Sequence, residues 1–135
     1  MAIVHLSKDN FNEEVLESKV PVLVDFWASW CSDCRKDAPA VVEMHREYKG
    51  KGVVFLGVSF DTNRESWANA VKKYGIDYVQ VSNLQKWKET EVSKAYHVNW
   101  IPSMYVIDAE GKVLLGTVVS SKVKALLGQL TSAAR

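Results

Sequence analysis

The two cysteines of the chain, Cys31 and Cys34, stand two residues apart in the segment Trp30-Cys31-Ser32-Asp33-Cys34. Residues 21–27 before them are β-branched, aromatic and too few for a helix, which predicts a buried strand. Residues 35–48 after them repeat apolar side chains at helical spacing. We therefore expect Cys31 at a helix N-terminus, where unpaired amides and the helix dipole favour a thiolate. Cys34, one turn later, is close enough to form a disulfide, and the pattern predicts thiol chemistry.

The bulk composition is that of a single globular domain over residues 1–135. The chain has 47% hydrophobic and 24% charged residues and a formal net charge of +1, which gives no electrostatic reason to expect nucleic acid as a partner. It has no run of about 18 apolar residues that could cross a membrane. Its first residues lack the basic start and apolar stretch of a signal peptide.

No metal or cofactor is expected beyond a redox-active Cys31–Cys34 disulfide. Two cysteines are too few for a secreted disulfide framework or for a four-ligand zinc site, and His5, His45 and His97 never fall at ligand spacing from them. His45 lies on the apolar face of its predicted helix. Such a histidine is more often a hydrogen-bonded core residue than a catalytic one.

The remaining patterns predict alternating strands and helices. Strands are expected at 3–6, 20–27, 53–60, 104–108 and 113–119, with a weaker candidate over 76–82. Helices are expected after Asn10, over 35–48 despite Pro39, after the cap 61–63, over 89–96 and over 123–130. Strands that alternate with helices before a terminal hairpin predict an α/β sheet with an antiparallel edge.

Several side chains are predicted to face the core. Glu13 completes a capping box with Asn10, and Phe11 and Val15 give the first helix its inward face. The later helices are expected to bury Trp67, Val71 and Tyr74, and then Val92, Ala95 and Tyr96. Trp27, Trp67 and Trp87 are expected to be core or half-buried aromatics.

Two segments carry a family resemblance. The residues 24–35, which read VDFWASWCSDCR, resemble the active-site segment of thioredoxins, and Ile101-Pro102-Ser103 resembles their cis-proline loop. The chain from Cys31 to Thr117, with an insert at about 62–97, is similar to the TlpA/ResA-type branch of thioredoxin-like reductases. The first thirty residues are more similar to ordinary thioredoxin. The resemblance implies a thioredoxin fold: a central mixed sheet with helices on both faces, an antiparallel C-terminal hairpin, and a helical insert before the cis-proline loop.

The sequence departs from the family between the cysteines. Thioredoxins usually have Gly-Pro there, and this chain has Ser32-Asp33. Asp33 opposes a thiolate at Cys31, whereas the helix dipole and Arg35 favour it. These residues are expected to tune the redox potential, and the sequence does not decide which effect wins.

Asp25 interrupts an otherwise apolar strand, and two interpretations stay open. In the first, its carboxyl points to the sheet edge or bonds a loop amide. In the second, which the family resemblance favours, it is a buried acid with a raised pKa that takes the proton of Cys34 during resolution.

The resemblance also predicts the substrate-binding residues. It implies that Pro102 is cis and faces the disulfide, and its ring, which has no N–H, leaves the backbone of Ile101 to pair with an extended substrate. Trp30 is expected on the surface of the site, and Trp100 either contacts substrate or packs on the surface.

The leading prediction is a thiol-disulfide oxidoreductase that reduces protein disulfides through Cys31 attack and Cys34 resolution, and that an upstream reductant protein or small thiol resets. A thiol-dependent peroxidase is the second possibility, because peroxiredoxins share the broad fold, although their threonine before the reactive cysteine is Ala28 here. A non-catalytic binding module is the third. We expect a monomer in the cytoplasm, with a periplasmic or membrane-tethered location as the alternative.

Overall fold

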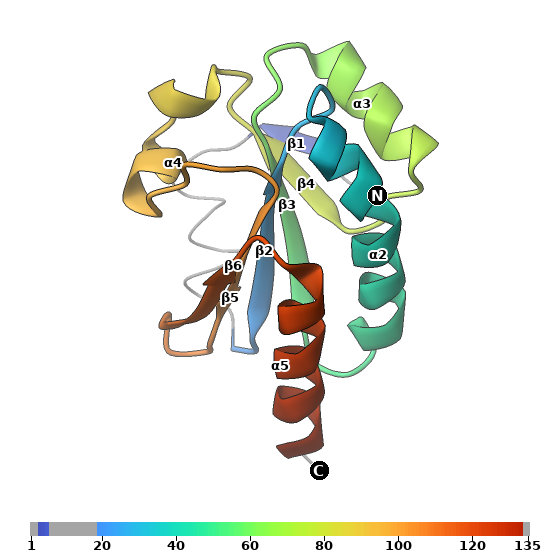
Figure 1. The fold of residues 1–135 in the computed structure, drawn as a ribbon, viewed down its shortest axis with the longest axis vertical. Coiled ribbons are helices and arrows are strands. Elements are labelled where there is room, and N and C mark those ends of the chain that lie inside the picture. The colour runs from blue at the N-terminus through green and yellow to red at the C-terminus, as the bar shows by residue number, and fades with distance from the viewer. Residues whose placement is uncertain (1–2, 6–18, 134–135) are drawn as a thin grey trace.

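The computed structural model describes residues 3–5 and 19–133, in which strands and helices alternate as predicted (Figure 1). The strands are β1 (Ile3–His5), β2 (Val22–Trp27), β3 (Val54–Ser59), β4 (Val79–Ser82), β5 (Ser103–Ile107) and β6 (Val113–Thr117). The helices are α2 (Ser32–Tyr48), α3 (Arg64–Lys73), the 3-10 turn η2 (Trp87–Glu89), α4 (Glu91–Ala95) and α5 (Ser120–Ala133). The predicted first helix, with Asn10, Phe11, Glu13 and Val15, lies outside the described residues.

The strands form a mixed sheet in the order β1-β4-β3-β2-β5-β6. The first four strands of that order pair in parallel, whereas β5 pairs antiparallel with both β2 and β6. The predicted mixed sheet with a C-terminal antiparallel hairpin is confirmed. Every residue of β2 is buried, which explains its continuous apolar sequence, because a central strand covered on both faces has no polar side.

Helices cover both faces of the sheet, as the fold class predicts. Figure 1 shows α2, α3 and α5 on one side and α4 on the other. On the first side, the His45 ring of α2 lies 5.0 Å from Phe55 and 5.2 Å from Tyr78, measured between ring centroids. On the second side, Phe60 stacks between Phe26 at 5.7 Å and Trp87 at 5.6 Å.

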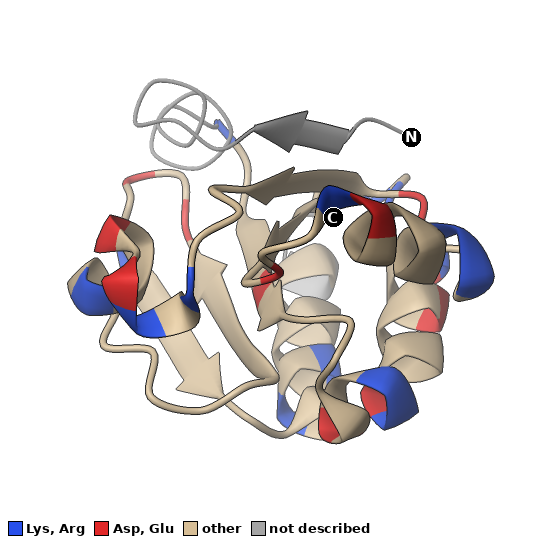
Figure 2. Ribbon diagram, turned by 90° about the horizontal axis from the view of Figure 1, so that it is seen from above, with Lys and Arg blue, Asp and Glu red and all other residues tan. Residues whose placement is uncertain are grey.

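Charged side chains lie mostly on helices and loops, and the strands are nearly free of them (Figure 2). Among the six strands that the structure describes, Asp25 in β2 is the one residue that is Asp, Glu, Lys or Arg. Placing a carboxyl on a buried central strand is costly unless its charge is paired or suppressed. Asp25 is therefore a candidate functional residue.

The predicted insert at 62–97 contains α3 and α4 and also β4, which pairs with β3 and β1 and so extends the sheet. One predicted core position in this segment is wrong. Ala95 is exposed and Ser93 is buried instead. Ser93 is buried because its hydroxyl donates to the carbonyls of Trp87 and Thr90 at 2.8 and 3.0 Å, and this turns that side of the five-residue α4 inward.

The aromatic predictions hold for the described tryptophans. Trp27 and Trp67 are buried in the core and Trp87 is half-buried. Val71 is also buried, and Tyr74, the C-cap of α3, is half-buried. The α3 helix then ends at Gly75, whose φ of 64° is the left-handed conformation that glycine adopts without strain.

Candidate active site

The Cys31–Cys34 pair sits at the start of α2, where the sequence places it. Cys31 is the N-cap residue with extended backbone angles, φ −87° and ψ 114°, and the Cys34 backbone N–H donates to Cys31 Sγ at 3.1 Å. The two cysteines form a disulfide with their Cα atoms 5.2 Å apart. The sulfur of Cys31 therefore occupies the position where the unpaired amides of a helix stabilise negative charge.

The loop that leads from β2 to Cys31 is held by Asp61. The Ser29 backbone N–H donates to both carboxylate oxygens of Asp61 at 3.2 and 3.1 Å, and the hydroxyls of Ser29 and Ser59 also donate to them. The predicted cap at 61–63 is therefore divided. Asn63 caps α3 by accepting from the Ser66 N–H at 2.9 Å, whereas Asp61 anchors the approach to the disulfide.

The predicted redox-tuning residues lie on the first turn of α2. Ser32, Asp33 and Arg35 are exposed. Arg35 Nη1 donates to the Ser29 carbonyl at 3.1 Å, so its guanidinium bonds the loop before Cys31. The first turn thus keeps a carboxylate and a guanidinium close in sequence to both sulfurs.

The cis-proline loop faces the disulfide. The Ile101–Pro102 peptide bond is cis, both residues are buried, and the Ile101 carbonyl oxygen lies 3.6 Å from Cys31 Sγ. Trp100 is 56% exposed just before this loop, and Trp30 is 56% exposed just before Cys31. The two tryptophans therefore present open aromatic surface at the sequence neighbours of the site, and neither belongs to its buried part.

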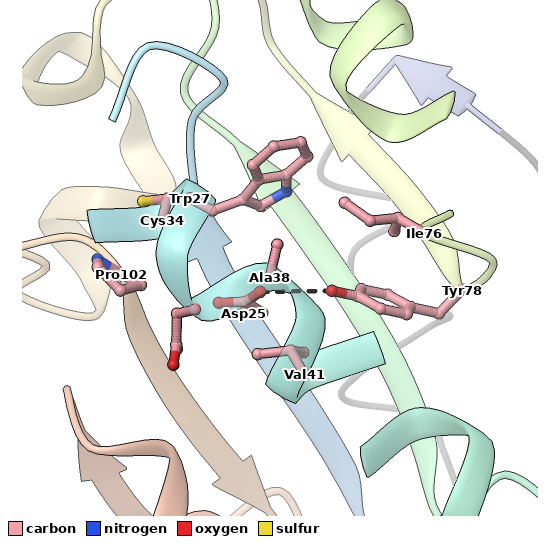
Figure 3. A pocket seen from close by; sticks show the side chains of 9 residues that line it. Asp25, Trp27, Cys34, Ala38, Val41, Ile76, Tyr78 and Pro102 are labelled. Carbon is pink, nitrogen blue, oxygen red and sulfur yellow. Dashed lines mark hydrogen bonds between the residues drawn. The ribbon is translucent and has the colours of Figure 1, made fainter. Parts of the chain in front are cut away.

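Behind the disulfide lies a small pocket into which the buried acid of β2 projects (Figure 3). Its polar lining includes Asp25, Asp37 and the Tyr78 hydroxyl, and Cys34 and Pro102 border it. The rest of the lining is apolar: Trp27, Ala38, Val41 and Ile76. The structure thus brings Asp25, Cys34 and Pro102 to one cavity, as the family resemblance implies.

The Asp25 carboxyl is poorly satisfied for a buried group. It is 6% exposed, Tyr78 Oη donates to its Oδ2 at 3.4 Å, and Oδ1 has no hydrogen-bond partner. Burial, and then the charge of Asp37, raise its pKa to about 7, while the Tyr78 hydrogen bond acts in the other direction. The first interpretation from sequence, a carboxyl at the sheet edge or on a loop amide, is wrong.

Two residues of the pocket, Asp37 and Tyr78, were not predicted from sequence. Burial raises the pKa of Asp37, a hydrogen bond with Ser120 offsets part of that rise, and one of its oxygens has no partner. Burial and then the charge of Asp25 raise the pKa of Tyr78 well above its usual value, so it remains a hydroxyl donor. The signal for Asp37 was present, because it lies on the helix face of the buried Ala38 and Val41.

His45 matches its prediction as a hydrogen-bonded, largely buried histidine. Its Nδ1 lies 2.8 Å from Asp77 Oδ1, and its side chain is 12% exposed. Among the side chains that the structure describes, no three of His, Cys, Asp or Glu are grouped so that they could hold a metal ion.

A helix-capping disulfide in contact with a cis-proline loop, beside a mixed sheet, is the site of a thiol-disulfide oxidoreductase. A family model described as Thioredoxin-like matches residues 19–113, and the chain belongs to this family. It is 38% identical to a thioredoxin of Thiocapsa roseopersicina over 93 residues, which are 69% of this chain and 97% of that protein.

The thiol-disulfide oxidoreductase ResA of Bacillus subtilis (strain 168) is 29% identical over 105 residues, or 76% of this chain. This match spans 56% of ResA, so the chain corresponds to little more than half of that relative. Among solved structures, the thioredoxin domain of a thiol-disulfide oxidoreductase from Bacteroides vulgatus superposes with a TM-score of 0.77 at 28% identity, covering 93% of this chain and 85% of that one. Both branches of the predicted resemblance are thus represented.

Proposed function

We propose that the chain reduces disulfide bonds of protein substrates. The observation that carries this proposal is the Cys31 sulfur at the N-terminus of α2, 3.6 Å from the carbonyl oxygen of the cis-proline loop. That position favours a thiolate and leaves it beside backbone that can align an extended substrate chain. The exposed indoles of Trp30 and Trp100 flank this position in sequence and would bind the apolar surface of the substrate.

The reaction begins with the reduced enzyme. The Cys31 thiolate attacks one sulfur of the substrate disulfide, so that an enzyme–substrate disulfide forms and one substrate thiolate leaves. Cys34 then attacks Cys31 Sγ, which breaks the mixed disulfide and releases the second substrate thiolate. Two electrons pass from the cysteine pair to the substrate. The enzyme is left with its Cys31–Cys34 disulfide and needs no other cofactor.

Asp25 is the proposed proton acceptor for resolution. Cys34 must lose its proton before it can attack, and Asp25, one of whose oxygens has no partner, lines the same cavity as Cys34. A carboxyl with a pKa of about 7 changes between its two forms at neutral pH, which suits a general base. Ser32, Asp33 and Arg35 would tune the potential from the exposed first turn.

The partners follow from this cycle: protein disulfide substrates, and a reductant protein or small thiol that resets the oxidised pair. We propose a monomer, and a cytoplasmic location fits the reducing direction, because thiols are kept reduced there. A periplasmic or membrane-tethered protein is the alternative. No described helix has both the length and the apolar character needed to cross a membrane.

Insulin-disulfide reduction in the presence of a thiol reductant tests the proposal. We expect the wild type to accelerate the reaction and Cys31→Ser to fall to the rate of the reductant alone. Equal rates for the two proteins would refute it. The reduction potential of the cysteine pair against glutathione then sets the direction of the reaction, since a potential well below that of the glutathione pool supports a reductase.

A further inference from the structure

Behind the pocket, one row of residues crosses three strands. Asp25 of β2 is paired in register with Gly57 of β3, and Gly57 is paired with Gln80 of β4. Residues opposite each other in register project to the same face of a sheet. Asp25 and Gln80 therefore project to the same face, which α2 covers, and Gly57, the residue between them in register, has no side chain.

Glycine at position 57 is what lets Gln80 lie over the middle strand. A Cβ atom built at Gly57 would lie 2.1 Å from Gln80 Nε2 and 2.6 Å from Gln80 Oε1. No Cβ tolerates such distances, so the Gln80 amide occupies the space that any other residue would fill. The amide has thus crossed from β4 toward the strand that carries Asp25.

The orientation of the Gln80 amide is fixed by Trp27. Trp27 Nε1 donates to Gln80 Oε1 at 2.9 Å, and both side chains are buried. Since an indole N–H can only donate, the amide oxygen must face it. The amide N–H₂ group is then the remaining end, and this buried Nε2 has no hydrogen-bond partner. An unpaired buried donor in a native protein calls for an explanation.

The unpaired acceptor in the same row is Asp25 Oδ1. A protonated carboxyl makes little use of a second donor, whereas a carboxylate is stabilised by each donor it accepts. Among the described residues, the other polar groups that face Asp25 in its pocket are Asp37 and Cys34 of α2 and the Tyr78 hydroxyl. The Tyr78 hydroxyl can donate to the carboxylate, while the charge of Asp37 opposes its ionisation.

We propose that Gln80 is a positioning residue of the thiol site: it holds Trp27 against the pocket, and its free amide N–H becomes a donor to Asp25 when that carboxyl ionises. The inference rests on the proposed function, in which ionised Asp25 receives the Cys34 proton. In that step the Cys34 S–H bond breaks, the proton moves to the carboxylate, and the electron pair stays on Sγ for the attack on Cys31. Gln80 stabilises the form of Asp25 that can accept the proton.

Two substitutions test this role without touching the cysteines or Asp25. Gln80→Met keeps the length of the side chain and removes its donor, and Gly57→Ala displaces the amide from above β3. We expect each to raise the apparent pKa that governs Cys34 resolution by about one pH unit, and to slow resolution at pH 7 roughly fivefold. The measurement is single-turnover decay of a mixed disulfide between pH 5 and 9. Gln85→Met, at an exposed glutamine, is the matched control and should leave the profile unchanged.

A merely structural role would lower stability and leave the pH profile in place. If folded Gln80→Met or folded Gly57→Ala gives the wild-type profile, the inference is wrong, and either variant alone suffices for this decision. The carboxyl titration of Asp25 followed by ¹³C NMR in the oxidised proteins needs no turnover. An upward shift in the variants therefore supports the inference, and an unchanged titration overturns it, even if the wild type fails to reduce insulin and the proposed function is lost.

Discussion

Two buried aspartates lie near the site, Asp25 in β2 and Asp61 just after β3. They differ in how many hydrogen-bond donors surround the carboxyl group. Asp61, after β3, is 1% exposed, accepts the backbone N–H of Ser29 at 3.1 Å, and accepts the hydroxyls of Ser29 and Ser59. Asp25, in β2, is 6% exposed, has one hydrogen bond of 3.4 Å, and has an oxygen with no partner. Both carboxyl groups are buried, but Asp61 accepts several hydrogen bonds and Asp25 accepts one long one.

The comparison shows that burial alone does not make a reactive acid. Donors that converge on a carboxyl group fix its position, and Asp61 in this way anchors the loop before Cys31. A carboxyl without such donors holds its proton to higher pH, and the pKa of Asp25 is about 7. Asp25 can therefore exchange a proton in the range where thiols react, and Asp61 keeps the loop in place while it does.

The largest expected effects are those of replacing the two cysteines. Cys31→Ser should abolish disulfide reduction completely, because it removes the attacking sulfur. Cys34→Ser should still attack and should accumulate the mixed disulfide, which mass spectrometry detects as an adduct with substrate. A Cys34→Ser protein that turns over at the wild-type rate would contradict the assignment of the two thiols.

Asp25→Asn tests whether Asp25, unlike Asp61, takes part in the reaction. Without a proton acceptor, resolution by Cys34 at pH 7 should slow on the order of 100-fold, while the initial attack by Cys31 stays unchanged. Stopped-flow measurement of mixed-disulfide formation and decay gives both rates. If Asp25→Asn resolves as fast as the wild type, Asp25 is not the acceptor.

Replacing the two aspartates should change the free energy of unfolding in opposite directions at pH 8. The folded-state pKa of Asp25 is raised from 3.8 to about 7, so the folded state binds the extra proton between these values, and the contribution of Asp25 to stability falls as the pH rises through that window. The free energy of unfolding of Asp25→Asn should therefore exceed that of the wild type by up to about 4 kcal/mol at pH 8, and the two values should differ little at pH 4.

Asp61→Asn should instead lower the free energy of unfolding by about 2 kcal/mol at pH 8, since an amide cannot accept all the hydrogen bonds that the Asp61 carboxyl accepts from Ser29 and Ser59. Urea unfolding followed by circular dichroism measures both variants in the oxidised state. Equal signs for Asp25→Asn and Asp61→Asn at pH 8 would remove the distinction between the two carboxyls.

The smallest expected effect is that of Asp37→Asn. The charge of Asp37 raises the pKa of Asp25, so its removal should move the pH profile of resolution to lower pH by less than about one unit. Glu43→Gln, at an exposed position of the same helix, is the control. An upward movement in Asp37→Asn would show that the two carboxyls do not repel each other.

The parts of the fold that were predicted follow from local patterns. The continuous apolar sequences of β2 and β3 mark strands covered on both faces, and Cys31 is placed at a helix start by the change from strand to helical spacing. The cis Ile101–Pro102 bond was implied by family resemblance. Asp25 was singled out because a carboxyl in a covered strand is costly, and the structure confirms its burial.

The groups that surround Asp25 were missed because register, rather than spacing, assembles them. Tyr78 meets Asp25 and Gln80 meets Trp27 across 53 residues of sequence, and the Gln80 amide lies over the middle strand at Gly57. No local pattern gives that register. The sequence predicts a helix cap that begins at Asp61, because Asp61 begins a run of capping residues, but Asn63 is the residue that caps α3.

The most direct test of the account is the titration of the Asp25 carboxyl in the oxidised protein, followed by ¹³C NMR and assigned with Asp25→Asn. The cysteines do not titrate in this state, so the carboxyl is observed without them. We predict a midpoint near pH 7. A midpoint near 4, the value of an ordinary aspartate, would contradict the central claim that this buried carboxyl gains and loses its proton near neutral pH, where Cys34 needs an acceptor.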